Sequence, residues 1–75
     1  MNLNLDDARD AFYEAKRTEI LPLAVNDVVT VRKGRKSGAR AWVISLESLP
    51  PESKYLIDYE DGSDEIIPLA DLNPE

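Results

Sequence analysis

The sequence of 75 residues predicts a mainly β fold: a small five-stranded barrel with an α-helix packed against it at the N-terminal end. Three observations lead to this prediction. Apolar residues recur every three or four positions near the N-terminus, short β-type segments follow about ten residues apart, and tight turn signals separate these segments. No β–α–β alternation occurs, so a parallel sheet is not expected. The length allows one compact domain, with the helix and its linker in residues 1–21 and the barrel in residues 22–75.

Residues 3–20 have the pattern of an amphipathic helix. Asn4 or Asp6 can cap its first turn, and Lys16 and Arg17 stand near its end, where cations suit the helix dipole. Pro22 ends the helix. The apolar face consists of Leu5, Ala8, Phe12 and Ala15. Because so short a helix is marginal alone, we expect this face to cover one open end of the barrel.

Four strands are expected in residues 27–33, 40–47, 54–59 and 64–68, and the tail 69–75 can add a turn of 3₁₀ helix and a final short strand. A loop with two glycines at 34–38, a loop with two prolines at 48–53 and an Asp-Gly turn at 61–62 separate the strands. Pro68 makes the fourth strand an edge or a terminus, because proline cannot donate to a central ladder.

Side-chain alternation assigns the faces of two strands. On the strand 40–47, one side carries Ala41, Val43 and Ser45, and the other carries Trp42, Ile44 and Leu46. On the strand 54–59, one side carries Tyr55, Ile57 and Tyr59, and the other carries Leu56 and Asp58.

The composition argues against catalysis and against a bound metal. The chain contains no histidine and no cysteine, and its 15 acidic residues outnumber 9 basic ones to give a net charge of −6. The commonest general base and the thiolate and imidazole metal ligands are therefore missing, and the acids do not follow a calcium-loop pattern. No nucleophile motif or phosphate-binding loop occurs either. We expect a protein that is not an enzyme and that uses no cofactor.

The N-terminal residues carry acids where a signal peptide would be apolar, and no run is long enough to span a membrane. A cytoplasmic protein is expected, nuclear if the source is eukaryotic, with no membrane partner.

Two segments resemble known families of small barrels. The segment NDVVTVRKGRKSGARAWV resembles the KOW motif, with matching positions at Val29, Val31, Gly34, Gly38, Ala41 and Val43. Ala41 stands where that motif has a third glycine. The segment YLIDYEDGSDEIIPLADL resembles the second half of Tudor and Agenet domains. Together the segments cover residues 26–72, and the resemblance implies an SH3-like barrel of the Tudor/KOW type.

The Tudor resemblance also implies where an aromatic cage for a methylated lysine would lie. It places Tyr59 and Asp61 at cage-like positions, and Trp42 could contribute from the second strand. Ser63 stands where many members carry an aromatic or amide side chain, and no aromatic ends the first strand. The implied cage is therefore partial at best.

The residues themselves suggest one ligand surface, formed by Trp42, Tyr55, Tyr59, Asp58, Glu60 and Asp61. Aromatic rings beside carboxylates favour a cationic or extended peptide. We therefore expect a non-catalytic binding module, an adaptor or accessory subunit whose partner is a protein or a basic peptide. A competing interpretation packs Trp42 in the core or under the helix.

A cluster of cations suggests an alternative function. It comprises Arg32, Lys33, Arg35, Lys36 and Arg40, with no acid among them. The loop could bind nucleic acid through phosphates, with Trp42 stacking on a base. It could instead be a hairpin tip that pairs with acids of the same domain. A third possibility is a scaffold that only mediates self-association.

Overall fold

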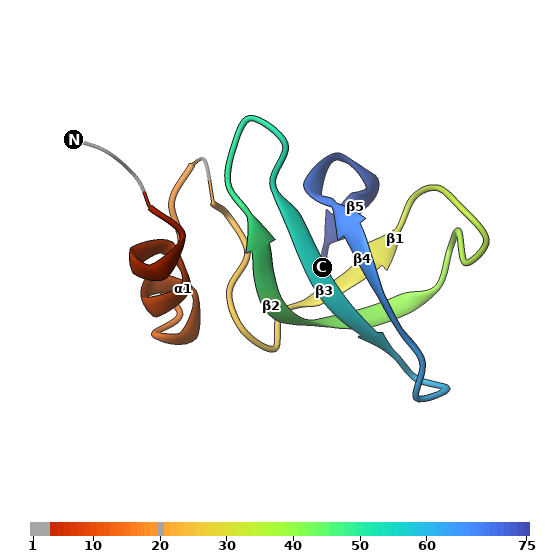
Figure 1. The fold of residues 1–75 in the computed structure, drawn as a ribbon. Helices are drawn as coiled ribbons and strands as arrows, with labels where there is room; N and C mark the ends of the chain where they lie inside the picture. Colours follow the sequence, from red (N-terminus) through yellow and green to blue (C-terminus); the bar gives the residue numbers. More distant parts are fainter. Residues whose placement is uncertain (1–3, 20) are drawn as a thin grey trace.

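The computed structural model describes residues 4–19 and 21–75, and it contains one antiparallel sheet of five strands and one N-terminal helix (Figure 1). The elements are α1 (Leu5–Tyr13), β1 (Val28–Val31), β2 (Arg40–Ser48), β3 (Lys54–Tyr59), β4 (Asp64–Pro68), the 3₁₀ turn η1 (Leu69–Asp71) and β5 (Leu72–Pro74). The strand order is β4-β3-β2-β1-β5. The predicted mainly β fold with an N-terminal helix is confirmed.

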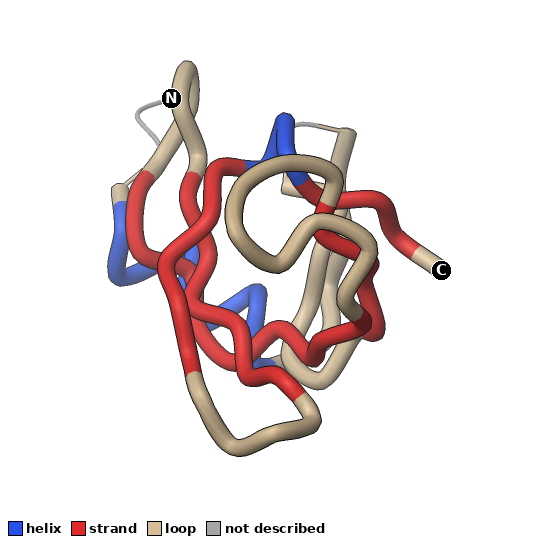
Figure 2. Tube along the Cα trace, turned by 90° about the vertical axis from the view of Figure 1, so that its right-hand side faces the viewer, coloured by secondary structure: helices blue, strands red, loops and turns tan. Residues whose placement is uncertain are grey.

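The sheet is open along one side. In the described part of the chain no ladder joins β4 to β5, so these two strands are its edges. The closed barrel expected from the sequence is therefore not seen in the strand pairing. The strands nevertheless curl around the interior, and η1 returns the chain so that β5 pairs with β1 (Figure 2).

Helix α1 begins and ends for local reasons. The Asn4 side chain accepts a hydrogen bond from the Asp7 N–H at 2.9 Å, which confirms Asn4 as the cap. At the other end Ala15 has a φ of +60°, its N–H donates to the Phe12 carbonyl and the Lys16 N–H donates to the Ala11 carbonyl. This is the Schellman arrangement that stops a helix.

The helix therefore ends earlier than the sequence pattern predicts. It stops at Tyr13, so Ala15 is exposed and lies outside the apolar face, and Lys16 and Arg17 are beyond the last turn. The ends of the predicted segment, Leu3 and Ile20, lie outside the described residues. Periodicity alone could not locate this end because the terminating residue is an alanine, not the glycine that usually occupies a left-handed position.

The regular alternation of side chains along strand β2 is interrupted part of the way along. The register with β3 shifts between Val43 and Ser45, and again between Leu46 and Ser48. The extra residue moves Leu46 to the inner face beside Val43, where it is buried. The prediction that Leu46 shares a face with Trp42 was therefore wrong, because a bulge reverses the alternation beyond it.

The core lies between the curled sheet and the helix. Its members include Ala8, Phe12, Leu23, Val29, Val31, Ala41, Val43, Leu46, Tyr55, Ile57, Ile67 and Leu72. The rings of Phe12 and Tyr55 lie 6.1 Å apart between centroids, and Arg9 Nε donates to the Leu46 carbonyl at 2.9 Å. These contacts hold α1 against the end of β2 (Figure 1). No helix within residues 4–19 and 21–75 has the length and apolar character needed to cross a membrane.

Candidate functional site

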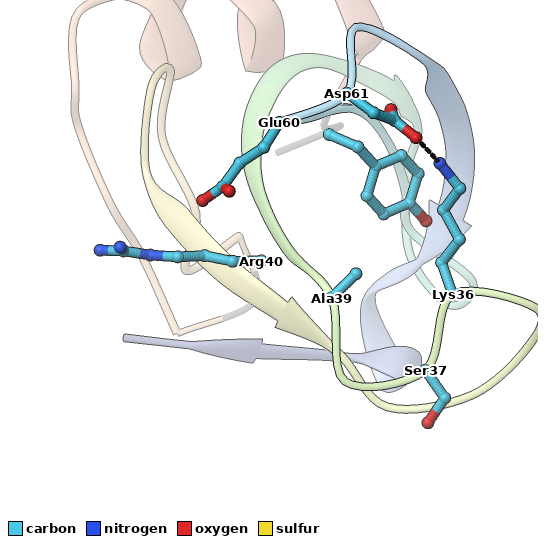
Figure 3. A pocket seen from close by; sticks show the side chains of 7 residues that line it. Lys36, Ser37, Ala39, Arg40, Glu60 and Asp61 are labelled. Carbon is cyan, nitrogen blue, oxygen red and sulfur yellow. Dashed lines mark hydrogen bonds and ion pairs between the residues drawn. The ribbon is translucent and has the colours of Figure 1, made fainter.

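An open pocket of about 450 Å³ lies where the loop between β1 and β2 meets the turn between β3 and β4. Its walls are Lys36, Ser37, Ala39, Arg40, Tyr59, Glu60 and Asp61 (Figure 3). Lys36 and Asp61 meet on one side of the pocket, and Arg40 and Glu60 extend on the other. We refer to it below as the Tyr59 pocket.

Tyr59 is the last residue of β3 and stands opposite Ala41 on the inner face of the sheet. Only 5% of it is exposed, and its hydroxyl donates to Glu65 Oε1 at 2.7 Å. Burial, the hydrogen bond to Glu65 and the negative charges of Glu65 and Asp61 raise the pKa of Tyr59 to about 12. The ring is therefore a fixed, neutral aromatic wall at ordinary pH.

A cation of the chain itself lies against this ring. Lys36 Nζ is 4.3 Å from the Tyr59 ring centroid, within the range of a cation–π contact. The same nitrogen is 2.6 Å from Asp61 Oδ2 and 2.6 Å from Ser63 Oγ. One ammonium group thus contacts an aromatic ring, a carboxylate and a hydroxyl together.

The turn between β3 and β4 orients Asp61. Gly62 has a φ of +88°, and the Tyr59 N–H donates to the Ser63 carbonyl at 2.8 Å, which closes the turn. Asp61 Oδ1 accepts the Ser63 N–H at 2.9 Å and the Ser63 hydroxyl at 2.6 Å. The hydrogen bonds from Lys36 and from Ser63 hold the pKa of Asp61 well below its usual range. The pocket therefore presents a permanent carboxylate beside the ring.

The loop between β1 and β2 is shaped by its own backbone hydrogen bonds. The Gly38 N–H donates to the Val31 carbonyl at 2.7 Å, and Gly38 has a φ of +89°. The Ala39 N–H donates to the Lys36 carbonyl at 2.9 Å, and Ser37 Oγ donates to the Arg32 carbonyl at 3.0 Å. These bonds direct the Lys36 side chain toward the turn between β3 and β4 without relying on its ammonium group.

The structure brings together only half of the six residues expected to form one ligand surface. Tyr59, Glu60 and Asp61 line the pocket. Trp42 and Asp58 pair with each other on the opposite face of the sheet, where Trp42 is half-buried. Tyr55 lies in the core with no exposed surface. Alternation separates Trp42 and Asp58 from Tyr59, because neighbouring residues of a strand point to opposite faces. Tyr55 is on the same face as Tyr59, but it is buried four residues away along β3.

Most cations of the predicted cluster already contact oxygen atoms of the same chain. Lys36 contacts Asp61, and Arg40 Nε lies 3.2 Å from Glu75 Oε2. Arg32 Nη1 donates to the Ala70 carbonyl at 3.4 Å. Lys33 and Arg35 are exposed and form no ion pair with any carboxylate of the described residues.

Two participants of the site escaped the sequence analysis. These are Ser63 and Glu65, which fix Asp61 and Tyr59. For Lys36, the interpretation of a hairpin tip that pairs with acids of the same domain agrees with its contact with Asp61, whereas its contact with the Tyr59 ring was not predicted. The charge asymmetry between the basic loop and the acidic turn was the available signal, because opposite charges on adjacent turns tend to meet. No cluster of metal-ligating side chains is found among residues 4–19 and 21–75.

The arrangement is suited to holding a cation between an aromatic face and a carboxylate. Comparison of the chain with models of protein families, with curated proteins and with solved structures finds no significant match.

Proposed function

We propose that this protein is a non-catalytic binding module that recognises a cationic side chain of a protein partner in the Tyr59 pocket. The observation that carries the proposal is the position of the Lys36 ammonium, 4.3 Å from the Tyr59 ring centroid and 2.6 Å from Asp61. This contact supports the proposal, since the same ring and carboxylate would attract a partner's arginine or lysine. The protein would act as an adaptor or accessory subunit.

The proposal includes an SH3-like barrel of the Tudor/KOW type. Its support is the antiparallel order β4-β3-β2-β1-β5 with a 3₁₀ turn before the last strand, together with the bulged β2, which lets a small sheet curl. The Tudor-like turn also places Tyr59 and Asp61 side by side at one pocket. A methylated lysine is a weaker candidate ligand, because the pocket wall contains one aromatic residue.

Nucleic-acid binding through the loop is the alternative. Lys36 and Arg40 already face carboxylates of the same chain, so a phosphate would have to compete with Asp61 and Glu75 for them. The pocket wall also contains two acids that repel phosphate. A cationic protein segment therefore fits the pocket better than a nucleic acid does.

Amide NMR spectra of the full chain test the proposal. The probe is a blocked glycine–serine peptide with one central arginine, and its control carries citrulline, which has the same shape without the charge. We expect saturable shifts confined to residues 36–40 and 59–63 with the arginine peptide, and none with citrulline. Tyr59→Leu should abolish them, whereas Asp58→Asn, which removes one charge from the opposite face, should leave them unchanged.

Equal shifts with both peptides, or shifts centred on Trp42, would contradict this site. A single-stranded RNA, titrated at two salt concentrations, tests the alternative: salt-sensitive binding that disappears in Lys33→Glu would favour nucleic acid. Failure of both ligands, together with a dimer in sedimentation, would favour a self-association scaffold.

A further inference from the structure

At one wall of the Tyr59 pocket, the position between the ring and Asp61 is already occupied by a side chain of the same molecule. The Lys36 ammonium makes three contacts there, with the Tyr59 ring, Asp61 Oδ2 and Ser63 Oγ. A partner's cation that used the same ring and carboxylate would need the same space and the same oxygen. The two cations cannot occupy the position together, since like charges at contact distance repel.

Arg40, the second cation of the pocket wall, is placed differently. Its guanidinium pairs with Glu75, and it makes no cation–π contact with Tyr59. Lys36 and Arg40 therefore contribute the same charge to the pocket, but only Lys36 fills the position between the ring and Asp61.

The loop that carries Lys36 does not depend on that contact. Hydrogen bonds from Gly38 to the Val31 carbonyl and from Ser37 to the Arg32 carbonyl hold the backbone. The pair is also open to solvent, because 29% of the Lys36 side chain and 62% of the Asp61 side chain are exposed. The side chain can consequently leave by rotating about its own bonds while the loop keeps its shape.

We propose that Lys36 is a resident competitor that holds the position between the Tyr59 ring and Asp61 until a partner's cation displaces it. This inference rests on the proposed function, because it requires that the pocket bind a cation from outside. It adds that the free protein is self-inhibited, so that wild-type affinity for a single cationic side chain is weaker than the pocket alone would provide. Removing Lys36 should therefore strengthen binding, which is the reverse of the effect expected for a residue that contacts the ligand.

The first experiment measures occupancy in the free protein. Trace labelling of the full chain with acetic anhydride, read by mass spectrometry, compares Lys36 with Lys33 of the same loop. We expect Lys36 to react several-fold more slowly in the wild type than in Asp61→Asn, with Lys33 unchanged, and addition of the arginine peptide to raise the wild-type Lys36 rate. A Lys36 rate that is the same in both proteins would overturn the inference.

The second experiment measures competition by titrating the arginine peptide into three proteins whose amide spectra confirm folding. Lys36→Ala should bind about tenfold more tightly than the wild type, the size that one ion pair and one cation–π contact can supply. Arg40→Ala removes an equal charge and should give a clearly smaller gain. If the wild type binds and Lys36→Ala binds no better, the competitor role is wrong while the proposed function survives. If no variant binds the peptide, both are wrong.

Discussion

Tyr59 shows how one residue serves both the fold and the pocket. Its ring is buried on the inner face of the sheet, and its hydroxyl donates a hydrogen bond to Glu65 at 2.7 Å. The carboxylate opposes ionisation of the phenol twice, by accepting its hydrogen bond and by its negative charge. Burial of the ring is the largest cause of the raised pKa of Tyr59, and Glu65, an acid that does not itself line the pocket, adds to it.

Glu65→Gln should lower the pKa of Tyr59 from about 12 toward its ordinary value, because glutamine keeps a hydrogen-bond acceptor and removes the charge. The measurement is an NMR titration of the Tyr59 ring carbon that bears the hydroxyl. Asp64→Asn removes a neighbouring charge that has no contact with the hydroxyl and should cause a smaller change. A Tyr59 pKa that did not move in Glu65→Gln would contradict this account.

The same pKa predicts a pH dependence of stability. The folded phenol keeps its proton to higher pH than the unfolded phenol does. The stabilising contribution of neutral Tyr59 is therefore complete below the ordinary tyrosine pKa near 10 and is lost as the pH rises toward about 12.

At the scale of elements, two of the departures from the expected pattern are local. Helix α1 stops at an alanine in the left-handed region, and β2 gains an extra residue that turns Leu46 inward. Neither changes the number or order of elements. The strands at 54–59 and 64–68 have the predicted bounds, because alternation and the Asp-Gly turn mark them locally.

Ala15→Gly should stabilise the protein by about 0.5–1 kcal/mol, since a left-handed φ is strained for alanine and free of strain for glycine. Urea unfolding followed by Trp42 fluorescence measures the change. Ala11→Gly, inside the helix, is the matched control and should destabilise by about 1 kcal/mol. Equal effects of the two substitutions would show that Ala15 is not strained in solution.

At the scale of the whole molecule, one small core joins the helix to the sheet. Phe12 is 2% exposed and contacts Tyr55, which lies in the middle of the sheet interior. A chain of this length gains only about 3–5 kcal/mol of net stability from its core. The helix and the sheet that positions the pocket should consequently unfold together.

Phe12→Ala should destabilise the protein by about 3–5 kcal/mol, which is comparable to its whole stability. Urea unfolding of the wild type, followed by circular dichroism and by Trp42 fluorescence, should give coincident transitions, and in Phe12→Ala both signals should be largely those of the unfolded chain even without urea. Ile66→Ala, at a large apolar residue that is 52% exposed, should shift the transitions much less. Loss of the helical signal with an unchanged Trp42 transition would mean that the helix is not part of the cooperative unit.

Local information in the sequence was enough to determine the mainly β class with an N-terminal helix, the five strands, the 3₁₀ turn and the Asn4 cap, because hydrophobic period and turn chemistry act over a few residues. The tertiary structure alone decided where the helix ends, which way Leu46 points and which face of each strand turns inward. It also decided that Lys36 meets Tyr59 and Asp61, two residues more than twenty positions away. Such contacts depend on how two loops converge in space, and no local pattern encodes that distance.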